Sequence, residues 1–284
     1  MTNLVVALQA EARPIIEAFD LVQDRPAGMF PVYCNGDLSL VVSGIGRACC
    51  AAAVIHLFHR TAQRADQAWL NIGIAGHQQV PIGSVLLASR ITERASGRCW
   101  YPPYVLDIEL LRSPVVTVDE PERCYRQCCA YDMEASSFYQ IASRCSTGEL
   151  VQSLKIISDN PGSNLDLTAD QISQLLADQM SAIESAVGQL SDLSRVLDTV
   201  RAPPDLSSLY LEQWHFTVAQ RHQLAALLNR LKARSIQLPA VPGTSEYQDA
   251  SGVLTWLEGK LLAIPVNLSV PQGEDAADRV EQPS

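Results

Sequence analysis

Hydrophobic residues in the first 190 positions form short runs separated by polar or amphipathic segments. Six runs predict strands because they are rich in aliphatic and β-branched residues: 3–8 (NLVVAL), 38–42, 69–74 (WLNIGI), 83–89 (GSVLLAS), 114–118 (PVVTV) and 150–157 (LVQSLKII). The segments 11–19, 49–58 and 134–144 predict helices between them. Strands that alternate with helices indicate an α/β sheet with helices packed on its faces.

Residues 169–190 carry the clearest helical pattern of the chain. Apolar side chains share one face at helical spacing, and they are Ile172, Leu175, Leu176, Ile183, Val187 and Leu190. Thr168 or Asp170 is placed to cap the first turn. We expect this helix to pack on the sheet and to close the domain.

The pattern changes after about residue 195. A proline-containing linker, RAPPDLSS, precedes a helix predicted at 215–234, whose leucines at 224, 227, 228 and 231 form a stripe. We expect this helix to pack on the main domain, with a partner-binding helix as the alternative. Residues 253–268 predict one more helix or a strand pair, and the polar, acidic tail predicts disorder. The expected domains are 1–195, a mainly helical extension at 196–270 and a disordered tail at 271–284.

Composition narrows the class of protein. Of 284 residues, 47% are hydrophobic and 18% charged, which suffices for a sizeable core. The net charge of −10 argues against non-specific binding to nucleic acid. No apolar stretch approaches the roughly 20 residues that span a bilayer, and the N-terminus has no basic region typical of a signal peptide. We expect a cytoplasmic protein without nucleic-acid or membrane partners.

Cysteines and histidines give no metal-binding pattern. The eight cysteines include a cluster at Cys124, Cys128 and Cys129, which is not a C-x-x-C pair and has no histidine at zinc-site spacing. Free thiols are expected in a reducing compartment. His77, in the turn after GIAG, is predicted to be an exposed turn residue, with contact to a ligand or to a neighbouring subunit as the alternatives. We expect neither a metal nor a cofactor.

Four segments place polar residues beside predicted strand ends. They are ALQAEARPI with Glu11, NIGIAGHQQVPIG, AYDMEASSF with Glu134, and KIISDNPGS with Asp159. In α/β sheets, sites form at the carboxyl ends of the strands. Each segment alone also has a structural explanation, because a carboxylate can cap a helix and Asp159-Asn-Pro-Gly can form an Asx turn. SGIGR matches neither the dinucleotide nor the P-loop fingerprint.

Taken together and in this order, the segments resemble the nucleoside phosphorylase and nucleosidase family, especially the methylthioadenosine/S-adenosylhomocysteine nucleosidases. GIAG, DMEAS and ISD carry the resemblance, which covers roughly residues 3–190. It implies a three-layer α/β/α sandwich with a mixed central sheet, here followed by a helical extension. It also implies a small nucleoside substrate and a homodimer or larger homo-oligomer. Ala75 and Gly76 of GIAG are expected to line the binding site.

The resemblance implies a role for each matched polar residue. Glu134 would hold the ribose hydroxyls, since a carboxylate can accept two hydrogen bonds from a vicinal diol. Met133 would contact the sugar. Asp159 would protonate N7 of a purine, which makes the base a better leaving group, and Ser158 would orient Asp159. Glu11 would act as the general base on an attacking water.

The chain departs from the nucleosidases at several positions. The segment 89–131, which in them supplies an aromatic residue that stacks on the base, is much shorter here. Trp100 and Tyr101 are candidates to replace that aromatic, although both can equally be loop residues packed on the domain. Ile74 stands where the nucleosidases have a serine near the reactive water. Lys155 stands where they have an arginine, and it joins the predicted binding residues.

We therefore predict hydrolysis of an adenosine-type nucleoside with a modified 5′ group. A phosphorylase and a non-catalytic nucleoside-binding protein are the alternatives. Glu11 favours hydrolysis because a carboxylate repels a phosphate dianion in a partly desolvated site. Asn71 stands where the phosphorylases carry an arginine. Arg47 and Lys155 could receive an anion, but a cation that faces Glu11 is more simply its ion-pair partner.

Overall fold

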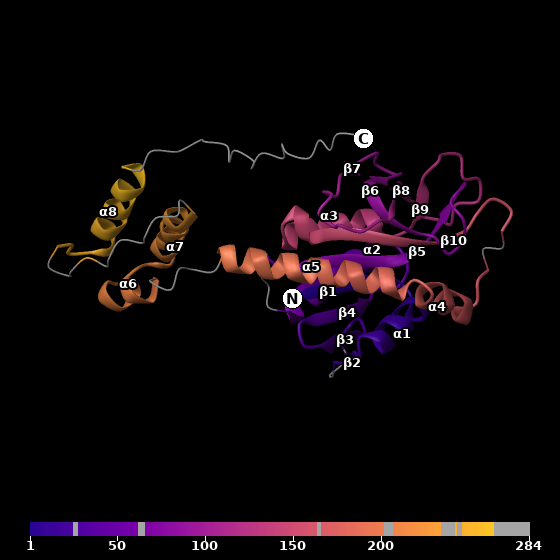
Figure 1. Cartoon of the computed structure of the whole chain (residues 1–284), viewed down its shortest axis with the longest axis horizontal. Coiled ribbons are helices and arrows are strands. Elements are labelled where there is room, and N and C mark those ends of the chain that lie inside the picture. Colours follow the sequence, from indigo (N-terminus) through magenta and orange to yellow (C-terminus); the bar gives the residue numbers. More distant parts are fainter. Residues whose placement is uncertain are drawn as a thin grey trace, which may run out of the picture. The chain divides into compact units, whose positions relative to one another are not determined.

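The computed structural model describes residues 1–24, 28–61, 66–163, 166–201, 207–233, 242 and 246–263. The chain divides into two compact units, residues 1–199 and residues 200–284 (Figure 1). We describe each unit by itself.

The first unit alternates strands and helices. In chain order its elements are β1 (Thr2–Val6), α1 (Gln9–Ala18), β2 (Val22–Gln23), β3 (Val32–Asn35), β4 (Leu38–Val42), α2 (Arg47–Arg60), β5 (Ala68–His77), β6 (Val85–Glu93), β7 (Cys99–Trp100), β8 (Leu111–Thr117), β9 (Ala130–Asp132), α3 (Ala135–Cys145), the short 3-10 helix η1 (Gly148–Leu150), β10 (Val151–Asp159), α4 (Ala169–Ala177) and α5 (Met180–Arg201), whose last residues enter the second unit.

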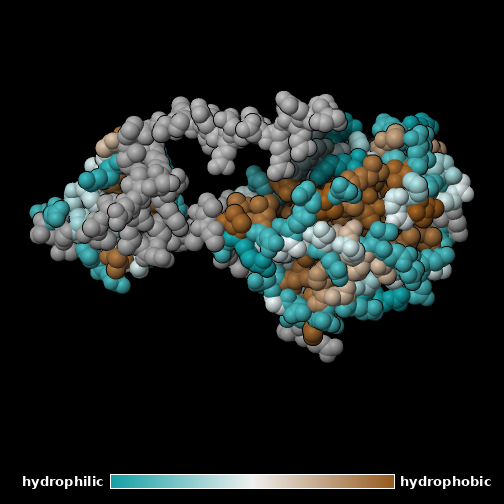
Figure 2. Space-filling model, viewed as in Figure 1, coloured by the Kyte–Doolittle hydropathy of each residue, from teal (hydrophilic) through white to brown (hydrophobic). Residues whose placement is uncertain are grey.

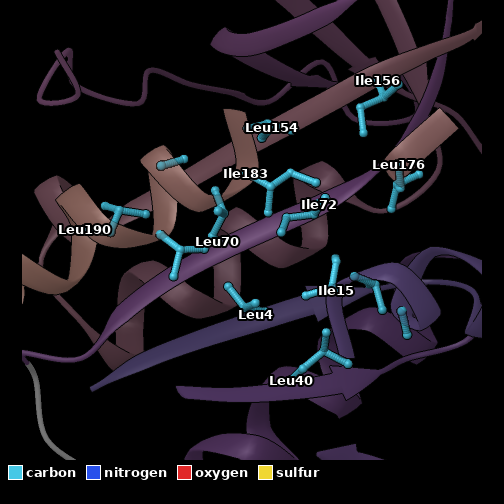
Figure 3. Close-up of a cluster of buried hydrophobic side chains, with 14 of the residues drawn as sticks. Leu4, Ile15, Leu40, Leu70, Ile72, Leu154, Ile156, Leu176, Ile183 and Leu190 are labelled. Atoms are coloured by element: carbon cyan, nitrogen blue, oxygen red, sulfur yellow. The ribbon is translucent and has the colours of Figure 1, made fainter. Parts of the chain in front are cut away.

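Helices cover both faces of one mixed sheet. Successive residues of a strand face opposite sides, and accordingly Leu4 and Val5 of β1 belong to different hydrophobic clusters. The cluster of Leu4 takes in side chains of α1, α4 and α5, including Ile15 and Ile183 (Figure 3). The cluster of Val5 takes in side chains of α2 and α3. The predicted three-layer α/β/α sandwich with a mixed central sheet is confirmed.

Part of the sheet closes on itself around β5. Strand β5 pairs with β10, β10 with β6, β6 with β8, β8 with β9, and β9 returns to β5. On its other side β5 pairs with β1, and β1 pairs with β4. Strands β1, β4, β5 and β10 all run parallel. The carboxyl ends of β1, β5 and β10 therefore meet at one edge, where ligand sites of α/β sheets form.

Several predicted boundaries in this unit are wrong. The strand predicted at 69–74 is β5, which continues to His77 because β9 pairs with Gly76 and His77. The single helix predicted at 169–190 is two helices, α4 and α5, which separate after Ala177. The expected cap is present: Thr168 accepts a hydrogen bond from the Gln171 amide and forms a capping box with that residue.

The second unit is helical where it is described, with α6 (Ser207–Gln213), α7 (Val218–Ala233) and α8 (Ala250–Leu262). The leucine stripe of α7 is buried in a cluster with α8 and with Tyr210 and Trp214. α8, from the same unit, thus covers the stripe, which differs from the expected packing on the main domain. Residues 250–262 form a helix, while 264–268 and the predicted disordered tail, 271–284, lie outside the described residues.

The surface carries apolar side chains as well as polar ones. On the face of the first unit seen in Figure 2, hydrophobic residues gather in a band between hydrophilic regions. Large apolar residues that are exposed include Ile45, Tyr104 and Leu111. In the described part of the chain, no helix is both long and apolar enough to cross a membrane. Apolar patches are surfaces through which proteins associate, but the predicted homo-oligomer stays a prediction.

Candidate functional site

A cavity of about 310 Å³ opens at the edge where β1, β5 and β10 end. This volume lies at the lower end of the usual range for small-molecule sites. Seven of the ten residues predicted from the sequence to form the site line the cavity: Glu11, Ala75, Gly76, Met133, Glu134, Ser158 and Asp159. The fold therefore brings together residues that are up to 148 positions apart, from Glu11 to Asp159.

Glu11 lies in the first turn of α1, and its side chain folds back toward the end of β1. Oε2 accepts hydrogen bonds from the amides of Ala7 at 2.8 Å and Leu8 at 2.9 Å, and Oε1 accepts one from Ile74 at 3.0 Å. The residue is only 2% exposed. Burial raises its pKa, against the effect of these amides and of the Lys155 charge. Three backbone donors thus hold a buried carboxyl group in one place at the cavity wall.

Glu134 follows β9 and is the N-cap residue of α3. Its Oε1 accepts a hydrogen bond from the Gly46 amide at 2.7 Å, which ties it to the turn before α2. Burial, and then the nearby Asp132 charge, raises the pKa of Glu134 to about 7. Glu134 is thus poised to change its charge near neutral pH.

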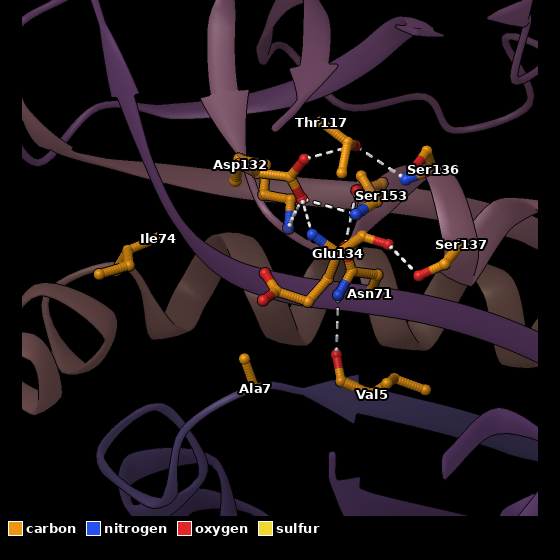
Figure 4. A network of polar contacts seen from close by, with 12 residues as sticks. Val5, Ala7, Asn71, Ile74, Thr117, Asp132, Glu134, Ser136, Ser137 and Ser153 are labelled. Carbon is orange, nitrogen blue, oxygen red and sulfur yellow. Dashed lines mark hydrogen bonds and ion pairs between the residues drawn. The ribbon is translucent and has the colours of Figure 1, made fainter. Parts of the chain in front are cut away.

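Asp132 organises the turn that presents Met133 and Glu134. Its Oδ2 accepts hydrogen bonds from the amides of Glu134 at 3.2 Å and Ala135 at 2.7 Å, and Oδ1 accepts one from the Thr117 hydroxyl at 2.7 Å (Figure 4). These bonds satisfy free amides at the start of α3, as a capping residue does. Sequence reasoning did not single out Asp132, although it stands in the DMEA motif.

Lys155 lies under the cavity and does not line it. Its Nζ is 2.9 Å from Asp132 Oδ2, and the two side chains are 1% and 0% exposed. Burial disfavours the charged ammonium, but Asp132, Glu134 and Glu11 outweigh that effect and keep the pKa of Lys155 above its usual value. The sequence predicts that Lys155 binds the substrate, and in this structure its ammonium group is bound by Asp132 instead of facing the cavity.

Asp159 ends β10 beside Gly76, with both carboxylate oxygens engaged. The Ser158 hydroxyl donates to Oδ1, and the Tyr125 hydroxyl donates to Oδ2. Burial raises the pKa of Asp159 to about 6. A carboxyl group with such a pKa can be protonated in part of the molecules near neutral pH, as a general acid requires.

Two aromatic residues that sequence reasoning missed, Tyr125 and Tyr131, line this cavity, and Tyr125 is the one hydrogen-bonded to Asp159. It is 2% exposed and lies edge-on to the Tyr131 ring, with 5.8 Å between centroids. Trp100 and Tyr101 do not line the cavity: Trp100 packs in part against the Val5 cluster, and Tyr101 is 68% exposed. The sequence held one signal, since Tyr125 is the only aromatic residue between positions 105 and 130.

His77 is buried, so its prediction as an exposed turn residue is wrong. The residue is 2% exposed because β9 pairs with the end of β5. Its Nδ1 accepts hydrogen bonds from the amides of Gln79 and Val80, both at 3.0 Å, and burial lowers its pKa. A neutral imidazole that accepts hydrogen bonds from two backbone amides stabilises this turn.

In the part of the chain that the structure describes, no three His, Cys, Asp or Glu residues form a group that could hold a metal ion.

Solved structures with this fold include nucleosidases. The chain resembles a 5′-methylthioadenosine/S-adenosylhomocysteine nucleosidase from Colwellia psychrerythraea in complex with adenine, with a TM-score of 0.56 and 17% identity over 66% of this chain and 95% of that one. A futalosine hydrolase from Helicobacter pylori matches with a TM-score of 0.53 and 16% identity, over 66% of this chain and 97% of that one. A 5′-methylthioadenosine nucleosidase from Arabidopsis thaliana matches with a TM-score of 0.55 and 18% identity, over 68% of this chain and 95% of that one. No family model and no curated protein sequence matches the chain.

Proposed function

We propose that the chain hydrolyses the N-glycosidic bond of a purine nucleoside, of the adenosine type with a modified 5′ group. The observation that carries the proposal is the single cavity that holds Glu11, Glu134 and Asp159. Two of these carboxyl groups have pKa values near neutrality, about 7 for Glu134 and about 6 for Asp159. Perturbed carboxyl groups that converge in one cavity are typical of an active site.

Each carboxyl group suits one part of the reaction. Asp159, when protonated, donates its proton to N7 of the purine, so that the base leaves as a neutral molecule and the sugar carbon gains positive charge. Glu134, when ionised, accepts hydrogen bonds from the ribose hydroxyls. Glu11 takes a proton from a water molecule while the oxygen of that water bonds to the sugar carbon. The products are the free base and the free sugar.

Lys155 and Arg47, the two cations that the sequence offered as an anion site, are both engaged in ion pairs, which favours hydrolysis over phosphorolysis. Lys155 is paired with Asp132, and Arg47 is paired with Glu93 and Asp119. Asn71, in the place where phosphorylases carry an arginine, donates to the Val5 carbonyl at 3.1 Å. Arg123 also lines the cavity, and the phosphate arm of the assay below tests whether it recruits an anion.

The comparisons support the substrate class. Two of the solved structures that share the fold are nucleosidases of 5′-methylthioadenosine, and one of them was determined with adenine bound. Their low identity leaves the 5′ group of the substrate to experiment, and futalosine, the substrate in the name of the third protein, belongs in the panel.

The test is chromatographic detection of free base from a panel of purine nucleosides that includes adenosine, 5′-methylthioadenosine, inosine and futalosine. Reactions run in phosphate-free buffer and with millimolar phosphate, and the sugar product is identified by mass. We expect free adenine and free sugar without phosphate, and a loss of at least about 10²-fold in Asp159→Asn, which cannot donate the proton. Sugar 1-phosphate as the main product would favour a phosphorylase. Binding without turnover would favour a non-catalytic nucleoside-binding protein.

A further inference from the structure

The Tyr125 side chain fills part of the cavity wall that a base would need. Its hydroxyl donates to Asp159 Oδ2, and its ring lies against Gly76. A Cβ atom at position 76 would be 2.6 Å from Tyr125 Cε1 and 2.7 Å from the hydroxyl oxygen, closer than real Cβ contacts. Gly76 thus provides a flat backbone surface beside Asp159, and in this structure an aromatic ring of the chain itself occupies that surface.

The loop that carries Tyr125 is residues 118–129, which connect β8 to β9. Its two end residues, Val118 and Cys129, are buried, and between them Tyr125 is the one buried residue. The rest of the loop is held at Glu122, which accepts hydrogen bonds from the amides of Arg123 and Cys124 and pairs with Arg94. Glu122 can keep the loop in place when the tyrosine side chain leaves the cavity.

The backbone of Tyr125 adopts an unfavourable conformation. Its φ of +42° lies in the left-handed region, where a bulky residue is unfavourable and is retained only when other contacts outweigh the strain. The contacts available are the ring packing against Tyr131 and the hydrogen bond to Asp159. Loss of the bond to Asp159 therefore removes one of the interactions that hold the ring in the cavity.

A base and the phenol compete for the same atom of Asp159. Oδ1 is engaged by Ser158 and Oδ2 by Tyr125. An acid that protonates a ring nitrogen must present an oxygen to that nitrogen at hydrogen-bond distance. Ser158 precedes Asp159 on the same buried strand and is 3% exposed, so the group that can give way is Tyr125 on its loop.

We propose that Tyr125 is a specificity-determining residue, which occupies the base position over Gly76 and yields it only to a planar nitrogen heterocycle that can both lie on this surface and hydrogen-bond Asp159. The inference rests on the proposed function, which makes Asp159 the residue that binds the base. A sugar or an aliphatic ligand would not replace the aromatic ring and its hydrogen bond. The apparent affinity for the base is reduced in proportion to the population in which Tyr125 is bound to Asp159.

The test measures equilibrium binding of free adenine to the full-length chain by calorimetry, without any catalytic step. Tyr125→Phe keeps the ring but removes the hydrogen bond to a carboxyl group, and we expect adenine to bind about tenfold more tightly. Tyr125→Leu also removes the ring and should bind adenine at least as tightly as Tyr125→Phe. The matched control is Tyr104→Phe, an exposed tyrosine stacked on Arg112, for which we expect unchanged binding. Circular dichroism verifies the fold of each variant.

Equal or weaker adenine binding by both Tyr125 variants would overturn the proposal, and a fall in turnover at the same time would show that the hydroxyl assists Asp159. The proposal would also be overturned if neither wild type nor any variant binds adenine. The proposed function fails in a different way: wild type would release no base from any nucleoside, even if Tyr125→Phe binds adenine more tightly.

Discussion

The stability of the site should depend on one buried cation, Lys155. The residue is the only lysine of the first unit, and its ammonium group lies 2.9 Å from Asp132 with both side chains excluded from solvent. Lys155→Met keeps most of the side-chain volume and removes the charge. Asp132 then remains buried with a negative charge near Glu11 and Glu134, whose pKa values Lys155 normally lowers.

The expected loss of stability in Lys155→Met is large because the charges of the ion pair are desolvated. Removing one partner of a buried ion pair typically lowers the free energy of unfolding by about 3–5 kcal/mol. For a unit of roughly 200 residues, this corresponds to a fall of roughly 6–20 °C in the unfolding temperature. The Asp132 carboxylate keeps its bonds to the Thr117 hydroxyl and two backbone amides, which places the expected value at the lower end of both ranges.

The assay is urea and thermal unfolding followed by circular dichroism. The double variant Lys155→Met/Asp132→Asn should recover much of the loss, because it removes both charges and leaves an oxygen for the amides of α3. Arg13→Met is the matched control: it breaks the pair with Asp170, whose side chains are 52% and 86% exposed, and should leave stability nearly unchanged. A loss below about 1 kcal/mol for Lys155→Met would refute the view that the charges of the site depend on this lysine.

Two further predictions concern catalysis. The proposed reaction needs Asp159 protonated and Glu134 ionised, and their pKa values are about 6 and about 7. We therefore expect kcat/KM to be highest near about pH 6.5, midway between these values. It should fall above that pH as Asp159 loses its proton and below it as Glu134 gains one. A pH profile that stays flat from 5 to 8 would contradict this assignment. Glu134→Gln should lower kcat/KM for ribonucleosides by about 10- to 100-fold, because the diol loses a charged acceptor. If wild type cleaves 2′-deoxyadenosine as fast as adenosine, the role given to Glu134 is wrong.

Strands and strand-end residues could be predicted from the sequence because both signals are local. β1 and β4 are buried on both faces and carry short aliphatic runs, while β10, equally buried, keeps an aliphatic pattern around Gln152, Ser153 and Lys155. Glu11 follows β1 and Asp159 ends β10, and the carboxyl ends of these parallel strands must share an edge. These two residues could therefore be expected to lie close together.

The features that could not be predicted depend on contacts with no periodic signal. β9 has three residues, too few for a pattern, yet it buries His77 and extends β5 past a glycine. The break between α4 and α5 falls at Asp178 and Gln179, where no proline or glycine marks it. Tyr125 reaches the cavity from a loop through a left-handed backbone conformation, which the sequence of an isolated segment does not specify.

The charges of the buried site also bear on the choice of substrate. Four carboxyl groups, those of Glu11, Asp132, Glu134 and Asp159, line the cavity, and one buried ammonium group, that of Lys155, pairs with Asp132. Full ionisation of these five groups would leave three more negative than positive charges among them. Burial opposes that state, and the pKa values of Glu11, Glu134 and Asp159 rise accordingly. Such a site retains a proton that it can donate.

The same excess of negative charge selects among reactions. A phosphate dianion would enter against the carboxylates, whereas a neutral nucleoside enters without that opposition. In N-glycosidic cleavage the base gains a proton and the sugar carbon becomes positive. A fixed negative environment stabilises that charge more than it stabilises the neutral ground state, which is the condition for lowering the barrier. The electrostatics around Lys155 and the hydrolytic function proposed for the cavity thus have a common physical basis.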